Sequence, residues 1–146
     1  MSSSLSEIKW GRVVVGAIVA TVVAFLLTLI IQFGYGLVLG FQLRGSPPQE
    51  MLIAAFTSAP FLIVDVVTAA VGALVGLRMA AQRSEGSAQL AGPIGGVVTG
   101  VLVLAQRTLR GYPSGLSIWT LLIFATAVLG GWLASLLAVR RARATV

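Results

Sequence analysis

The chain has 146 residues, of which 58% are hydrophobic and only 10% are charged. A typical soluble domain is about one-quarter charged, so a soluble fold of this composition could not cover its surface, and a lipid bilayer is the expected solvent. Cysteine and histidine are both absent, which excludes disulfides, thiolate or imidazole metal sites and the usual general base near neutral pH. The chain also has only four acidic residues, which are few for hydrolytic or metal chemistry. We therefore predict no catalytic residue, no metal, no cofactor and no enzyme activity.

The net charge is +6, a balance that in a soluble protein would suggest nucleic acid as a partner. Here the lysine and arginine residues cluster at the ends of apolar segments. Flanking positive charge of this kind is typical of membrane helices. We therefore expect a lipid bilayer as the partner and no nucleic acid.

Four segments are long and apolar enough to cross a hydrocarbon core, which takes about 20 residues of helix. They cover residues 13–35, 51–77, 90–106 and 116–139. The first is longer than the apolar run of a cleaved signal peptide, and no charge follows it before Arg44, so the helix can continue through 34–41. The loops are short. The sequence thus predicts one all-α domain over 1–146, a four-helix transmembrane bundle with antiparallel helices.

The distribution of positive charge predicts the orientation of these helices. Two of the predicted ends and one loop carry seven basic residues: Lys9, Arg12, Arg78, Arg83, Arg140, Arg141 and Arg143. The opposite side carries three: Arg44, Arg107 and Arg110. Because positive loops stay in the cytoplasm, we expect both termini there, in a multi-pass protein of the bacterial inner membrane.

Small residues four positions apart predict how the helices pack, because lipid-embedded helices associate through close backbone approach. The clearest stripe is Gly92, Gly96 and Gly100, and helix 51–77 carries Gly72 and Gly76. These two helices are joined by a short loop, so we expect their glycine faces to meet. Similar stripes occur in the first helix (Gly16, Ala20, Ala24) and in the fourth (Ala127, Gly131, Ser135). A homo-oligomer interface is the alternative use of such a stripe.

Asp65 is the one charged residue between Ala59 and Leu77. It is expected near the bilayer midplane on the face that carries Gly72 and Gly76. A charge at that depth costs about 2.5–3.5 kcal/mol on insertion scales, so we expect a neutral acid that donates to a hydroxyl. Thr99, Thr126 and Thr21 are the candidate partners. Pro60 is expected to kink the helix. Asp65 is then either a proton or cation site or a hydrogen-bonded link between helices.

Two further groups of polar residues stand near the ends of the predicted helices. Gln32 and Gln106 lie near the outer ends of the first and third helices. We expect them to be solvated at the interface, with an outward vestibule as the alternative. On the inner side, a basic rim is expected to attract anionic lipid; it consists of Arg78, Arg83, Arg140, Arg141 and Arg143.

The hairpin VGALVGLRMAAQRSEGSAQLAGPIGGVVTGVLVL, residues 71–104, resembles a loose group of small bacterial four-helix membrane proteins of unknown function. Their second helix is glycine-rich and ends in arginine, and a short polar turn leads to a glycine-rich third helix. The resemblance implies the fold and no activity. Small multidrug exporters place an acid in the first helix and fluoride channels carry a characteristic asparagine, whereas this chain has neither.

These observations favour a non-enzymatic membrane protein of structural or accessory type, acting alone, as a homo-oligomer or within a larger membrane assembly. The alternative is a small oligomeric transporter or channel that uses Asp65 as its proton or cation site. A transporter predicts that Asp65→Asn leaves folding intact and abolishes flux in reconstituted vesicles. An accessory protein predicts no flux and a partner that co-purifies.

Overall fold

The computed structural model describes residues 8–81, 88–109 and 118–144. These residues form five helices and no strand: α1 (Trp10–Leu43), α2 (Gln49–Phe56), α3 (Ala59–Ala81), α4 (Ala88–Leu109) and α5 (Ile118–Ala144). All except α2 contain a stretch long and apolar enough to cross a membrane, at residues 10–43, 59–78, 90–109 and 118–140. The prediction of an all-α chain with four such helices is therefore confirmed.

Helix α1 is longer than its predicted segment, 13–35. Its 34 residues correspond to about 51 Å at 1.5 Å per residue. It ends at Arg44, whose left-handed φ of 53° turns the chain out of the helix. The amide of Gly45 donates to the carbonyl oxygen of Gly40 at 3.1 Å, which satisfies one of the acceptors left open in the last turn.

The predicted helix 51–77 is wrong in one respect, because the structure divides it into α2 and α3. Thr57 and Ser58 separate them, and the Thr57 hydroxyl donates back to the carbonyl oxygen of Ile53 at 2.9 Å. Pro60 stands exposed in the first turn of α3. A proline there has no amide hydrogen for the Phe56 carbonyl and its ring clashes with that group, so the chain breaks the helix where a kink was expected.

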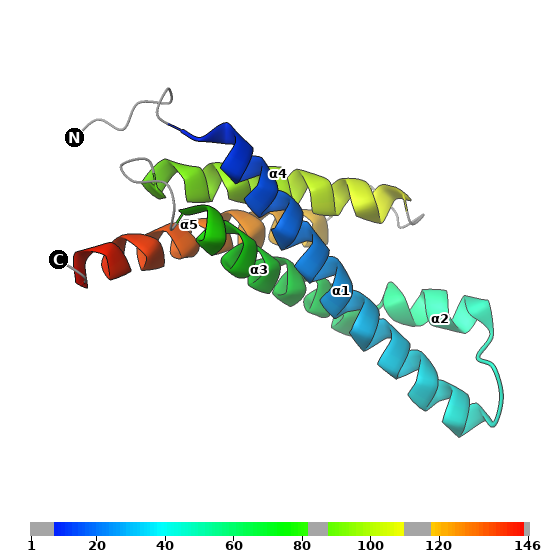
Figure 1. The fold of residues 1–146 in the computed structure, drawn as a ribbon. Helices are drawn as coiled ribbons and strands as arrows, with labels where there is room; N and C mark the ends of the chain where they lie inside the picture. Colours follow the sequence, from blue (N-terminus) through cyan, green and yellow to red (C-terminus); the bar gives the residue numbers. More distant parts are fainter. Residues whose placement is uncertain (1–7, 82–87, 110–117, 145–146) are drawn as a thin grey trace.

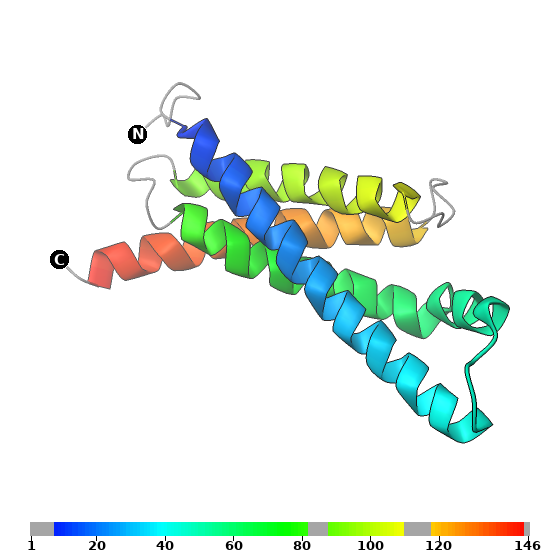
Figure 2. The ribbon, with the colours of Figure 1, turned by 45° about the vertical axis from the view of Figure 1, so that its right-hand side comes forward.

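The four long helices pack mainly in three pairs: α1 on α3, α4 on α5, and α3 on α5. In Figures 1 and 2, α4 and α5 lie side by side, and α1 runs along α3 at a small angle. The first turn of α1 and the last turn of α5 lie toward the same end of the molecule. The core holds few large side chains; Leu77, Ile123 and Val13 are the largest that are fully buried.

The glycine stripes lie at helix contacts, but the expected pairing between the second and third predicted helices is wrong. A Cβ on Gly72 would collide with the backbone of α1 at Ala20, and one on Gly76 would collide there as well. Gly92 and Gly96 instead face α5, where a Cβ on Gly96 would lie 2.6 Å from the carbonyl oxygen of Ala127. Gly72 and Gly76 therefore meet the small-residue stripe of α1, and Gly92 and Gly96 meet the stripe of α5, the next helix along the chain.

Gly100 and Gly95 complete these contacts with larger side chains. A Cβ on Gly100 would lie 2.7 Å from the ring of Phe124 on α5. Gly95 faces the side chain of Leu77, which also reaches Gly131. Leu77 therefore fills the space where α3, α4 and α5 converge, at the end where α3 finishes.

The opposite end of the molecule is built differently. The second half of α1 leaves the other long helices, and its last turns lie apart from α2 (Figure 1). The rings of Tyr35, Phe56 and Phe61 meet edge to face with centroids 5.0–6.2 Å apart, so they join α1, α2 and α3. Beyond this contact α1 exposes large apolar side chains, with Phe41 81% exposed.

Candidate functional site

Asp65 forms an ion pair with Arg107, and this is the central finding at the site. Nη1 of the Arg107 guanidinium donates to Oδ2 of the Asp65 carboxylate, and both side chains are mostly buried, 18% and 16% exposed respectively. Asp65 comes from α3 and Arg107 from the last turn of α4. We expected a neutral aspartic acid hydrogen-bonded to a threonine. That expectation is wrong, because the carboxylate pairs with a charged residue 42 positions away.

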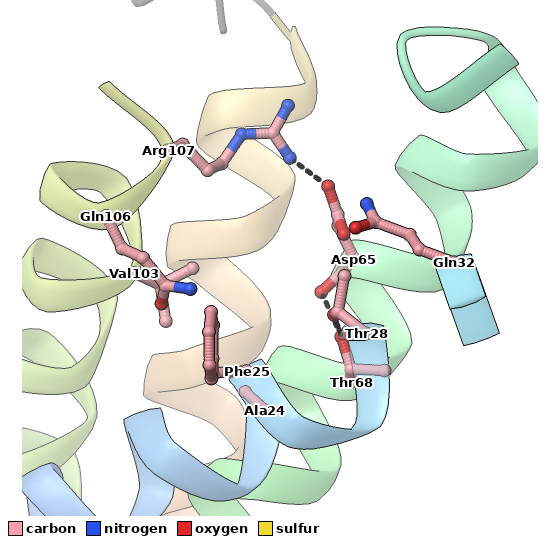
Figure 3. A pocket seen from close by; sticks show the side chains of 9 residues that line it. All are labelled: Ala24, Phe25, Thr28, Gln32, Asp65, Thr68, Val103, Gln106 and Arg107. Carbon is pink, nitrogen blue, oxygen red and sulfur yellow. Dashed lines mark hydrogen bonds and ion pairs between the residues drawn. The ribbon is translucent and has the colours of Figure 1, made fainter. Parts of the chain in front are cut away.

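The depth expected for Asp65 also changes. Because α3 begins at Ala59, Asp65 lies about 9 Å along the helix from its first residue, at 1.5 Å per residue. It is thus closer to the end where α4 finishes than was expected from a helix beginning at Met51. Arg107 lies in the last turn of α4, three residues after Leu104. Its side chain reaches Asp65 from that same end (Figure 3).

Asp65 and Arg107 line a small pocket to which three helices contribute. Its volume is about 30 Å³. The polar lining consists of Thr28 and Gln32 from α1, Asp65 and Thr68 from α3, and Gln106 and Arg107 from α4, and the apolar lining consists of Ala24, Phe25 and Val103. Figure 3 shows Gln32 extending toward the carboxyl group of Asp65. The pocket therefore brings six polar side chains from three helices together in one place.

The two threonines fix the innermost part of the pocket. The hydroxyls of Thr28 and Thr68 are 2.9 Å apart and form a hydrogen bond between α1 and α3. Both residues are buried, 8% and 5% exposed. Thr68 can also donate to the carbonyl oxygen of Asp65 at 3.2 Å. This contact continues the α1–α3 interface that starts at Gly76 and Gly72, since a threonine pair replaces the small residues one turn further on.

The other residues singled out with Asp65 lie apart from it. Thr99 is fully buried, but its hydroxyl donates to the carbonyl oxygen of Gly95 on its own helix at 2.8 Å. It does not line the pocket. Pro60 is exposed five residues before Asp65 and is likewise not part of the lining. Neither residue belongs to the site.

The basic rim is only partly described. Arg78 lies half-buried near the end of α3 and Arg140 is exposed near the end of α5. Helix α5 carries Arg141 and Arg143 beyond it, whereas Arg83 lies outside the described residues. Both helices end toward the side of the molecule where α1 begins (Figure 2). The lipid contact expected of these residues stays a prediction.

Gln32 and Gln106 were expected to be solvated at the interface, but both are partly buried in the structure, and an outward vestibule stays a prediction. Both line the pocket with Asp65. For the charged partner of Asp65, the sequence contained one usable signal. A buried acid needs a partner of opposite charge, and the basic residues on the outer predicted side were Arg44, Arg107 and Arg110. Choosing Arg107, and adding Thr28 and Thr68, required knowing how α1 packs against α3 and where α4 ends.

The chemistry available here is limited to hydrogen bonding and charge. Within residues 8–81, 88–109 and 118–144, no three histidine, cysteine or acidic side chains come together in a way that would hold a metal ion. One carboxylate, one guanidinium, two amides and two hydroxyls can bind a small polar molecule or link helices to one another. No protein-family model, curated protein or solved structure matches the chain.

Proposed function

We propose that this chain is a multi-pass membrane protein of non-enzymatic, structural or accessory type, in which the Asp65–Arg107 pair clamps helices together. The ion pair is the observation that carries the proposal. Removing one member of a buried pair costs about 3–5 kcal/mol, because the other charge is left uncompensated. That cost measures the charge left without its partner and not the net strength of the intact pair. The pair is thus a polar link that favours one arrangement of α3 against α4, beside their apolar contacts.

The proposal includes a bacterial inner membrane with both termini in the cytoplasm and the four long helices crossing in alternate directions. The asymmetry of lysine and arginine supports it. Arg107 belongs to the minority side of that count, and its charge is already paired with Asp65. The rule counts Lys and Arg and gives acids little weight, so this pairing leaves the count of seven against three unchanged.

An assembly with other membrane proteins, or with further copies of this chain, is supported by the end of the molecule beyond the pocket. Helix α2 has no buried residue, and the second half of α1 exposes Phe33 (64%) and Phe41 (81%). Lipid tails cover such a surface as well as a protein does. Purification in a mild detergent, followed by identification of co-eluting proteins, distinguishes the two.

The alternative is a small oligomeric transporter or channel with Asp65 as its proton or cation site. The gathering of six polar side chains between membrane-spanning helices favours it, because polar groups at such depth commonly mark transport paths. Two observations oppose it: Arg107 repels a cation from Asp65, and a pocket of about 30 Å³ is too small for a solute much larger than water.

Charge substitution at the pair tests the proposal. Asp65→Asn and Arg107→Gln should each lower stability in mixed micelles by about 3 kcal/mol. The exchange Asp65→Arg with Arg107→Asp should recover part of the loss, because it restores opposite charges at the same two positions. The unsubstituted protein in sealed vesicles should show no proton or cation flux.

The transporter alternative predicts a different pattern. Asp65→Asn would then remain folded, and a flux measured for the unsubstituted protein would disappear. A stable Asp65→Asn variant that has lost such a flux would refute the clamp, whereas two unstable single variants and a partly restored exchange variant support it.

A further inference from the structure

We propose that the pocket between α1, α3 and α4 is a water-binding site within the membrane-spanning part of the protein. It is reached from the end of the molecule where α3 begins and α4 finishes. The inference depends on the proposed membrane placement, but holds whether the protein is an accessory component or a transporter. The ligand is water itself, held among charged and polar side chains.

The size of the pocket matches this ligand. A cavity needs a volume of about 10–15 Å³ to hold one water molecule, and this pocket has a volume of about 30 Å³. One water molecule fits, and two fill the space. Apolar cavities of comparable size stay dry, so the lining decides whether the space is hydrated.

The lining supplies the partners that a buried water requires, which number two to four. The carboxylate of Asp65 accepts hydrogen bonds and the guanidinium of Arg107 donates them. The amides of Gln32 and Gln106 can do both, from two different helices. A water at this position would join α1 to α4, two helices that otherwise make fewer contacts than the main pairs.

The exposure of the ion pair gives the direction of access. Asp65 and Arg107 keep 16% and 18% of their side-chain surface exposed, whereas Thr28 and Thr68, at the other end of the pocket, are 8% and 5% exposed. The pocket is therefore more open on the side of the ion pair. Water there also reduces the desolvation cost of two charges placed between membrane helices.

Single cysteines can report hydration, because the chain has none of its own. Thr28→Cys places a thiol in the pocket with little change of volume. Ile30→Cys is the matched control: it lies two residues further along α1, and its side chain is 66% exposed in the structure but faces lipid in the proposal. Silver ion is the probe, because it is small and replaces the thiol proton to give a silver thiolate and a free proton.

Each variant is reconstituted in sealed vesicles with silver nitrate on both sides, so that the result does not depend on orientation. Thiols that have not reacted are then counted with a fluorescent maleimide after denaturation. Cys at position 28 should react on the order of tenfold faster than Cys at position 30, because hydrocarbon excludes a bare ion. An unreactive Cys at position 28 in a folded protein would overturn the water site.

A reactive Cys at position 30 would overturn the inference for a different reason, since it would show that the membrane placement itself is wrong. If Thr28→Cys fails to fold, a second pair on α4 replaces it. Gln106→Cys lies in the pocket, and Ala105→Cys is exposed on another face of the same helix. The same difference in rate is expected, and equal rates contradict the proposal.

Discussion

Replacing Gly96 with alanine tests the packing of α4 on α5 most directly. The added Cβ would lie 2.6 Å from the carbonyl oxygen of Ala127 and 2.7 Å from the Cα of Val128. Both are backbone atoms, so no side chain can rotate away. Reaching ordinary contact at 3.4 Å requires the two helices to separate by about 0.8 Å.

The expected magnitude is the difference between two effects. Forcing one extra carbon into a tightly packed contact costs about 1–3 kcal/mol, and alanine is favoured over glycine in a helix by up to about 1 kcal/mol. A net loss of up to about 2 kcal/mol is expected for Gly96→Ala. Gly34→Ala is the control, because a Cβ there meets nothing within 4 Å and only the helix preference remains.

The assay is reversible unfolding in mixed micelles with increasing SDS, followed by tryptophan fluorescence from the three tryptophans. The midpoint should fall for Gly96→Ala and stay equal or rise for Gly34→Ala. If both variants change stability by the same amount and in the same direction, the close approach of α4 and α5 is not what holds them together, and the account of glycine packing is refuted.

Three further substitutions test other contacts with the same assay. Leu77→Ala should lose about 2 kcal/mol or more, because it leaves a cavity at the convergence of three helices; an effect no larger than that of an exposed residue such as Val75 would contradict this packing. Thr68→Val should cost about 0.6 kcal/mol, the average for a hydrogen bond between membrane helices, and Thr28→Val should add little to it in the double variant, since one bond cannot be lost twice. Phe61→Leu should cost about 0.5–1.5 kcal/mol through loss of the edge-to-face contacts with Tyr35 and Phe56, and unchanged stability would show that α2 is held by other means.

The helical part of the fold could be read from the sequence with little error. An apolar run of 20 residues in lipid has to satisfy every backbone hydrogen bond within itself, so it must be a helix. The exception is instructive. Helix 51–77 was expected to continue through Pro60, because a proline within an apolar run can either kink a helix or end it, and only the structure shows that Thr57 and Ser58 complete the break.

The site was less predictable. Asp65 stood out because it is charged where its neighbours are apolar, and that anomaly is local. Its partner Arg107 is 42 residues away and looked like a loop charge, since its position along the sequence carries no information about which helix its side chain reaches. Gln32, Gln106, Thr28 and Thr68 are ordinary residues individually and acquire meaning only where three helices meet.

The sequence by itself therefore determined the helical conformation, the four runs long and apolar enough to cross a membrane and the presence of small-residue faces, because each depends on composition and short-range spacing. Only the tertiary structure decided which face meets which, and hence that Gly72 and Gly76 lie against α1 while Gly92 and Gly96 lie against α5. Glycine stripes are chemically alike, so close approach alone cannot select one partner over another. The choice follows from all the contacts made together, including the Asp65–Arg107 pair, whose two members lie 42 residues apart in the sequence.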